Sequence, residues 1–254
     1  MNLPNPFPGV SSRTRTDVQI SAPITTTSSY KFKKAGKNGV LITAILDESG
    51  SMRSCWSTTI SGFNEYVNGQ RSADASAGEA SLTLMKFDAP QIHTVYVNRP
   101  INEIPALTTE TYKPNGGTNL FDAIGDAITS VQNVLTSKKK KDRPGVIITI
   151  MTDGEENSSR RYNSEQLKEM VKAAEDADWT FTFLGANINV FAVGSTFGMS
   201  ALNSVSYSTA NMAATMSATS ASTTRMRSAK MAGASNRSIY ENGLYTSAEL
   251  KSMK

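Results

Sequence analysis

The chain has few of the residues that build covalent or catalytic centres. Its 254 residues include one cysteine, Cys55, and one histidine, His93. A single cysteine excludes an intrachain disulfide and a cysteine-based zinc site. A Ser-His-Asp triad could use only His93, which we expect in the middle of a strand with a structural role. No serine or cysteine has a recognisable base, and the sequence therefore predicts a protein that is not an enzyme.

Long apolar runs and nucleotide-binding loops are lacking as well. The longest apolar run, residues 146–151, suits a strand, whereas a membrane span needs about 20 apolar residues. The amino terminus shows no charged segment followed by an apolar one, so we expect no secretory signal. No Gly-Lys-Ser/Thr loop occurs, and no Gly-x-Gly-x-x-Gly opens a helix. These absences predict a protein of the cytoplasm, or of a virus particle, with no membrane partner.

Charge divides the sequence into three parts. Residues 1–38 carry six basic and one acidic side chain, residues 39–215 carry 14 and 19, and residues 216–254 carry six and two. We therefore expect a basic arm rich in Pro, Ser and Thr, an acidic domain, and a basic tail rich in Ala, Ser and Met. Such asymmetry is typical of contact with nucleic acid or with an acidic protein surface, but it also occurs where it only keeps a segment soluble.

Apolar patterning predicts an α/β fold. Two nearly continuous apolar runs are typical of strands buried on both faces of a parallel sheet. Two further strands are separated by residues 88–91 alone, which indicates an antiparallel hairpin at one edge. Strands that alternate with helices specify a doubly wound, mostly parallel sheet with helices on both faces. After about residue 210 we expect a helix that frays into the tail. The expected strands are 40–46, 81–87, 92–97, 146–151, 179–184 and 204–207, and the expected helices lie around 60–67, 120–135, 167–174 and 190–193.

Polar turns follow the buried strands of this predicted sheet. Asp47 and Asp153 each come directly after an apolar strand, and ligands of open α/β sheets bind outside the carboxyl ends of the strands. Thr118 opens a helix after two glycines, which let the backbone approach the site closely. Ser49 and Ser51 alternate with other residues, so their hydroxyls can point the same way as the Asp47 carboxylate. We expect these five side chains to converge.

All five side chains offer oxygen atoms, and two of them are carboxylates. Hard cations such as Mg²⁺ prefer oxygen ligands in a near-octahedral array and keep some water, while Mn²⁺ and Ca²⁺ are alternatives. Five protein ligands leave one coordination position open. An acidic side chain of a partner protein could fill it, which would make the metal site a recognition site.

These residues resemble the signature of von Willebrand factor type A domains. Residues 47–51 fit the Asp-x-Ser-x-Ser loop, and Gly117-Thr118 and Thr152-Asp153-Gly154 fit the second and third metal loops of that family. The resemblance covers roughly residues 38–210 and includes all five positions of the metal-ion-dependent adhesion site. The segment 180–199 is similar to compact intracellular members from bacteria and their phages.

The resemblance implies bound magnesium or manganese and a protein partner that supplies Asp or Glu. It implies that Ser49, Ser51 and Thr118 lie nearest the ion, with Asp47 and Asp153 acting through water. Two other readings stay open at the level of the sequence. One is a self-associating assembly protein, such as a component of a phage particle, whose basic arms contact neighbouring subunits. The other is an accessory subunit of an ATP-driven machine. Binding of nucleic acid through the arms is the less favoured use of their charge.

Overall fold

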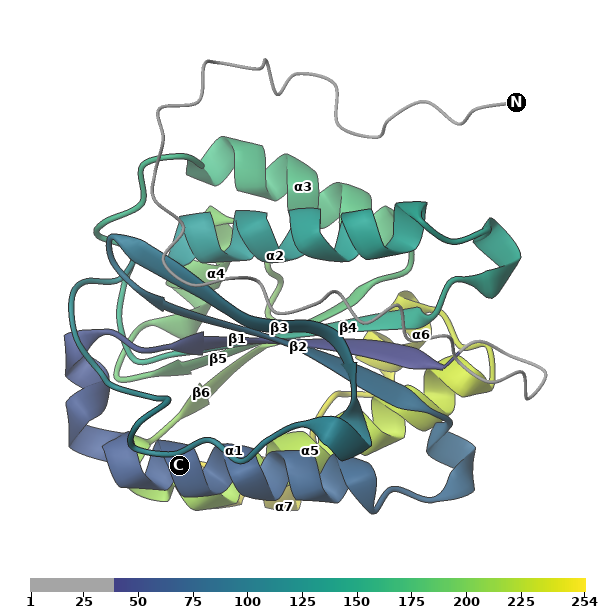
Figure 1. The fold of residues 1–254 in the computed structure, drawn as a ribbon, viewed down its shortest axis with the longest axis horizontal. Coiled ribbons are helices and arrows are strands. Elements are labelled where there is room, and N and C mark those ends of the chain that lie inside the picture. The colour runs from purple at the N-terminus through teal and green to yellow at the C-terminus, as the bar shows by residue number, and fades with distance from the viewer. Residues whose placement is uncertain (1–38) are drawn as a thin grey trace.

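Residues 39–254 form a three-layer α/β fold around one six-stranded sheet, seen in a computed structural model (Figure 1). The expected basic arm, residues 1–38, lies outside the described residues. The strand order is β3-β2-β1-β4-β5-β6, and only β2 and β3 pair antiparallel. The predicted fold class is therefore confirmed. The strands are β1 (Val40–Asp47), β2 (Ala80–Asp88), β3 (Gln91–Pro100), β4 (Gly145–Thr152), β5 (Thr180–Ala186) and β6 (Ser204–Tyr207).

Strands β1 and β4 lie side by side in the middle of the sheet. Every residue of β1 is buried, as are all residues of β4 except its first. Such burial on both faces explains why these strands read as continuous apolar runs rather than as alternating ones. The two strands are parallel and in register from Val40 opposite Gly145 to Leu46 opposite Met151, so their carboxyl ends reach the same edge.

Helices cover both faces of the sheet. Helices α2, α3 and α4 pack on one face with the core side chains of Leu41 and Ile148, and α1 and α5 pack on the other with Ile42 and Ile147 (Figure 1). Among the described helices, none combines the length and the hydropathy needed to cross a bilayer. The helices are α1 (Trp56–Arg71), α2 (Leu120–Thr136), α3 (Ser164–Asp176), α4 (Val190–Thr196), α5 (Met212–Met231), α6 (Asn236–Glu241) and α7 (Ser247–Ser252).

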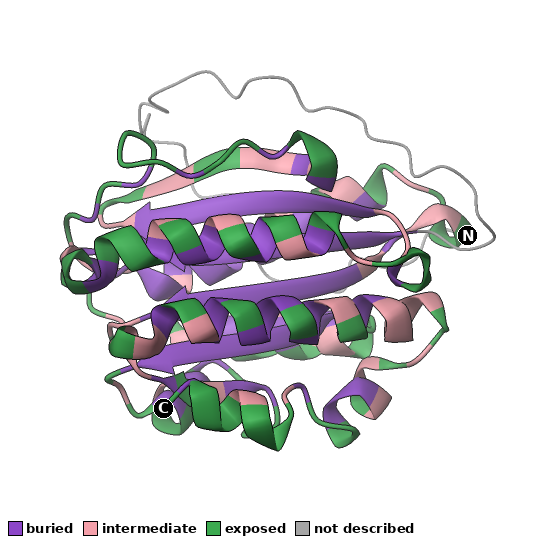
Figure 2. Ribbon diagram, turned by 90° about the horizontal axis from the view of Figure 1, so that it is seen from below, coloured by how far each residue is buried: buried purple, intermediate pink, exposed green. Residues whose placement is uncertain are grey.

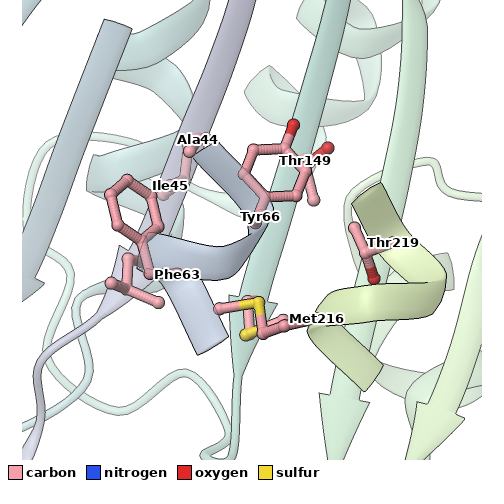
Figure 3. A pocket seen from close by; sticks show the side chains of 9 residues that line it. Ala44, Ile45, Phe63, Tyr66, Thr149, Met216 and Thr219 are labelled. Carbon is pink, nitrogen blue, oxygen red and sulfur yellow. The ribbon is translucent and has the colours of Figure 1, made fainter. Parts of the chain in front are cut away.

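Helices α1 and α5 run side by side across the lower face, with their exposed residues turned outward (Figure 2). Glycine allows this close approach, since a Cβ on Gly62 would lie 2.6 Å from Cγ of Met216. A small cavity of about 20 Å³ remains between these helices and the sheet, beside Tyr66, Thr149 and Met216 (Figure 3). That volume holds about one water molecule.

The carboxyl-terminal segment differs from the expected tail. Residues 216–254 complete α5, form α6 and α7, and pack into the core, where Met253 and Leu244 are buried. Several of their positive charges contact groups of the fold. Arg225 pairs with Glu249 at 2.7 Å, and the buried Arg227 donates to the backbone oxygens of neighbouring segments. The segment therefore packs as part of the domain.

Candidate metal site

The predicted site lies where the direction of chain progression across the sheet reverses. From β1 the chain proceeds to β2 and β3 on one side and then returns to β4 on the other. Asp47 is the last residue of β1 and Asp153 directly follows β4, so both reach the same edge at this switch point. Ligands of open α/β sheets bind in this crevice, because loops from neighbouring strands diverge there.

The first loop turns its polar atoms toward one point. The backbone N–H of Ser49 donates to Oδ1 of Asp47 at 2.7 Å, which fixes the carboxylate. The hydroxyls of Ser49 and Ser51 lie 3.1 Å apart. Ser49 is buried, whereas Ser51 is exposed in the 3-10 helix η1 (Gly50–Cys55). The two hydroxyls therefore point to the same place, as expected, and Ser51 is the member of the pair that faces solvent.

The third loop meets the first through a short hydrogen bond. The hydroxyl of Ser51 donates to Oδ1 of Asp153 at 2.5 Å, across 102 residues of sequence. Asp153 is half-buried. Thus four of the predicted residues, Asp47, Ser49, Ser51 and Asp153, form one connected chain of polar groups from the interior to the surface.

The second loop brings Thr118 to the same place. Two glycines precede it, and Gly116 has a φ of +65° with backbone oxygens of the β2–β3 turn where a Cβ would stand. The N–H of Thr118 donates to Oδ1 of Asn157 at 3.0 Å, in the loop that begins with Asp153. Its hydroxyl lies beside Gly154, where a Cβ would come within 2.9 Å. Within residues 39–254 that hydroxyl makes no hydrogen bond, which leaves it free for a ligand.

The two carboxylates are costly to ionise in this setting. Burial raises the pKa of Asp47 to about 6, against the opposing effect of hydrogen bonds from Thr152 and Ser49. Burial also raises the pKa of Asp153, opposed by the hydrogen bond from Ser51. In the part of the chain that the structure describes, neither carboxylate pairs with a lysine or an arginine. A bound cation would supply the missing positive charge.

The donor set fits a hard divalent cation. Ligands at 2.0–2.1 Å from an octahedral Mg²⁺ lie about 2.9 Å from their neighbours, which follows from the octahedral angle. The separation of 3.1 Å between the Ser49 and Ser51 hydroxyls is close to that value. The absence of nitrogen and sulfur donors among the five residues also favours magnesium, manganese or calcium over zinc.

Other residues hold the site in place, and the sequence pattern did not identify them. The hydroxyl of Thr152 donates to Oδ2 of Asp47 at 2.5 Å, and the hydroxyl of Tyr112 donates to the Asp47 backbone oxygen at 2.6 Å. Glu48 turns the opposite way and forms a buried ion pair with Lys86 at 2.7 Å. Only the position of Thr152, next to Asp153, could have signalled its role. The contacts of Tyr112 and Lys86 join parts of the chain that are distant in sequence.

A second group of potential ligands lies close by. Oxygens of Glu48 and Asp88 and a ring nitrogen of His93 fall within 4.8 Å of one another. However, Lys86 already donates to both Glu48 oxygens, at 2.8 and 2.7 Å, so its ammonium group occupies the place that a metal ion would need. His93 pairs instead with Asp88 at 3.1 Å. These contacts favour the structural role predicted for His93.

Comparison with known proteins shows structural similarity to solved domains. No family model matches the chain, and no curated protein matches it. The von Willebrand factor domain of the type V pili tip protein Mfa5 from Porphyromonas gingivalis aligns with a TM-score of 0.54 and 11% identity, over 78% of this chain and 97% of that one. The pilus adhesin SpaC from Lactobacillus rhamnosus GG aligns with a TM-score of 0.56 and 12% identity, over 77% and 32%.

A third match is proximal thread matrix protein 1 from the mussel byssus, with a TM-score of 0.52 and 10% identity. It covers 76% of this chain and 47% of that protein, so the chain spans about half of the mussel protein and about a third of SpaC. At these identities the likeness concerns the fold alone. The described chain has a fold similar to that of the von Willebrand factor domain of Mfa5.

Proposed function

We propose that this chain is a non-enzymatic binding module whose divalent cation accepts an acidic side chain of a partner protein. The ion would be held by Ser49, Ser51 and Thr118, with Asp47 and Asp153 in support. The observation that carries the proposal is the connected polar chain from Asp47 to Asp153, together with the unpartnered hydroxyl of Thr118. When bound, a cation of this kind supplies a strong electrostatic attraction for an external carboxylate.

The residues of the site differ in how deeply they are buried, and their proposed roles differ accordingly. Asp47, Ser49 and Thr118 are buried, so they can hold an ion without meeting the partner. Ser51 and the half-buried Asp153 border the solvent, which is where an external carboxylate would arrive. Neutral hydroxyl ligands leave more of the ion's charge uncompensated than carboxylate ligands would. This composition favours the capture of an anionic group.

Other functions receive less support from the described residues. An assembly role through two basic arms is weakened for the second arm, because residues 216–254 pack into the fold and Arg225 and Arg227 bind groups of the chain itself. The remaining arm, residues 1–38, lies outside the described part. We keep the expectation that the protein works in the cytoplasm or in a virus particle. A role beside an ATPase would use the same metal-dependent contact and would be a case of it.

Selection from a random peptide library tests the proposal without knowledge of the partner. The full chain is immobilised in Mg²⁺, and retained peptides are released with EDTA. We expect the released peptides to be enriched in Asp and Glu, and we expect a Thr118→Ala bait to retain none of them. Ser54→Ala is the matched control, since Ser54 lies in the same 3-10 helix and donates only to the backbone oxygen of Ser51. Retention that persists in EDTA would contradict the proposal.

A further inference from the structure

An arginine borders the candidate metal site. Arg53 follows Ser51 by two residues in η1, and its side chain is exposed. Its Nε donates to the backbone oxygen of Pro114 at 3.1 Å, and its Nη2 donates to Oδ1 of Asn115 at 3.3 Å. These partners lie directly before the Gly116-Gly117-Thr118 loop. The guanidinium therefore rests against the loop that carries Thr118.

That loop is itself tied to the first metal loop. The N–H of Asn115 donates to the backbone oxygen of Glu48 at 2.8 Å, and the N–H of Gly50 donates to that of Gly116 at 3.1 Å. The segment that carries Arg53 and the segment that its guanidinium contacts are thus joined by backbone hydrogen bonds. Two hydrogen bonds hold the side chain in one place, so less rotamer entropy is lost when it binds a ligand than for a freely moving arginine.

The guanidinium retains unused donors and has no acidic partner. An arginine offers five N–H groups, and Arg53 uses one on Nε and one on Nη2. In the described range, three other exposed arginines pair with carboxylates, namely Arg161 with Asp126, Arg225 with Glu249 and Arg237 with Glu241. Arg53 forms no such pair within residues 39–254. It is a fixed positive charge whose remaining donors face solvent next to the metal loops.

We propose that Arg53 binds a second carboxylate of the partner, so that the site recognises two neighbouring acidic groups. One carboxylate reaches the ion, and the other accepts hydrogen bonds from the free N–H groups of Arg53. This inference rests on the proposed function, because the first carboxylate needs the ion. It identifies the partner as a segment with two closely spaced acidic side chains. An arginine suits this task because its planar fork matches a carboxylate.

A purely structural role for Arg53 makes a different prediction. Trp56 ties the same loop, since its Nε1 donates to the backbone oxygen of Tyr112 at 2.7 Å. If Arg53 only fastened the loop, Trp56→Phe would have a similar effect on ligand binding. Lys113 is a second, exposed positive charge in that loop and already pairs with Glu110. Lys113→Ala therefore controls for the general attraction of anions.

The test uses the Mn²⁺-loaded full chain and simple carboxylates as probes. Acetate offers one carboxylate, and succinate, glutarate and adipate offer two at increasing separation. Displacement of water from Mn²⁺ is followed by water-proton relaxation. We expect the best dicarboxylate to bind several-fold more tightly than acetate. Arg53→Ala should weaken the dicarboxylate by about three- to tenfold, the range of an arginine–carboxylate contact, while acetate binding stays unchanged. Arg53→Lys should restore part of the preference.

The outcomes separate this inference from the proposed function. If Arg53→Ala keeps the dicarboxylate preference, or if Trp56→Phe or Lys113→Ala removes it equally, Arg53 is not the second contact. If the wild-type chain loads Mn²⁺ and binds acetate but prefers no dicarboxylate, the inference fails and the metal-dependent function stands. If the chain loads no Mn²⁺, the proposed function and the inference fall together.

Discussion

Asp47 is a buried carboxylate that only neutral donors hold. It has no exposed surface, and its oxygens accept from the Ser49 N–H and from the Thr152 hydroxyl. Hydrogen bonds from neutral groups lower the cost of burying a charge but do not cancel it, and its pKa is raised to about 6 accordingly. The negative charge of Asp47 is thus available to bind a cation, and the two hydrogen bonds fix the orientation of its carboxylate.

Thr152 should tune metal affinity without touching the ion. Thr152→Val removes the hydroxyl that holds Oδ2 of Asp47 and keeps the shape and the β-propensity of the side chain. We expect Mn²⁺ to bind at least about tenfold more weakly, as is typical when an outer partner of a metal site is lost. Calorimetric titration measures the affinity. Thr149→Val is the control in the same strand, since the Thr149 hydroxyl is buried without a partner in the described structure. Equal affinities for both variants would refute this role.

The single histidine allows a direct pH measurement. A hydrogen bond to Asp88 raises the pKa of His93 above 6.5, with burial opposing it. Because the folded pKa is raised, the pair stabilises the fold fully below pH 6.5 and less as the pH rises through the folded pKa. The ring resonances of His93 in NMR spectra should titrate above pH 6.5 in the wild type and at lower pH in Asp88→Asn. A wild-type midpoint below 6.5 would contradict the pairing.

At the scale of elements, strands were easier to predict than caps and the last helices. Continuous apolar runs located β1 and β4, and a last strand was expected at Ser204–Tyr207, where β6 lies. Helix α3 begins at Ser164, before the expected range of 167–174, and Asn163 caps it in a capping box with Gln166. Asn163 and Ser164 are both good capping residues, and only the backbone path selects one of them.

Helix α5 begins where a helix was expected, after about residue 210, but the burial of the carboxyl-terminal part was not predicted. The only apolar residues of α5 are alanines and methionines, and yet Thr215, Ser222 and Thr223 are buried as well. Small hydroxyl-bearing residues can be buried when the hydroxyl bonds within the helix or to a neighbour, as Thr219 does to the Thr215 backbone oxygen at 2.7 Å. The meeting of the candidate site residues at one edge of the sheet could be predicted, because each follows a strand or opens a helix. Their supporting contacts could not be predicted, because those depend on distant loops.

Close packing of α1 on α5 should make Gly62 intolerant of a methyl group. A Cβ there would lie 2.6 Å from Cγ and 3.0 Å from Cβ of Met216. Overpacking lowers the free energy of unfolding by about 1–3 kcal/mol, while the higher helix propensity of alanine over glycine raises it by about 1 kcal/mol. We expect Gly62→Ala to lower the free energy of unfolding in urea. In a Met216→Ala background the same change should stabilise the protein or have no effect, and a cost of equal size in both backgrounds would contradict the packing account.

At the scale of the whole molecule, the domain reaches almost to the end of the chain. Residues 232–254 bring Leu244 and Met253 into the core, and the Ser208 N–H donates to the Met253 backbone oxygen at 2.8 Å. Composition had suggested a soluble basic tail, because charge and small residues alone do not reveal ion pairs such as Arg225–Glu249. Charge asymmetry in a sequence thus describes a surface only after the pairs within the fold are known.

Tyr240 tests whether this segment is part of the cooperative fold. Its hydroxyl accepts from the Phe181 N–H at 2.8 Å and donates to Glu175 at 3.1 Å. Tyr240→Phe leaves a buried N–H of β5 without its acceptor, which costs about 1–3 kcal/mol. Urea unfolding should show a decrease of that size in the free energy of unfolding. Tyr245→Phe is the control, because its hydroxyl only approaches the Thr219 hydroxyl at 3.3 Å. An unchanged midpoint for Tyr240→Phe would mean that the segment frays.

The measurement that tests the central claim most directly is the titration of the full chain with Mn²⁺. We expect one saturable ion for each chain, released by EDTA, with binding lost in Thr118→Ala and in Ser49→Ala and retained in Ser54→Ala. Thr118 and Ser49 come from different loops, so the loss in both variants would place the ion between them. Absence of saturable binding in the wild type, or equal binding in all the variants, would contradict the account.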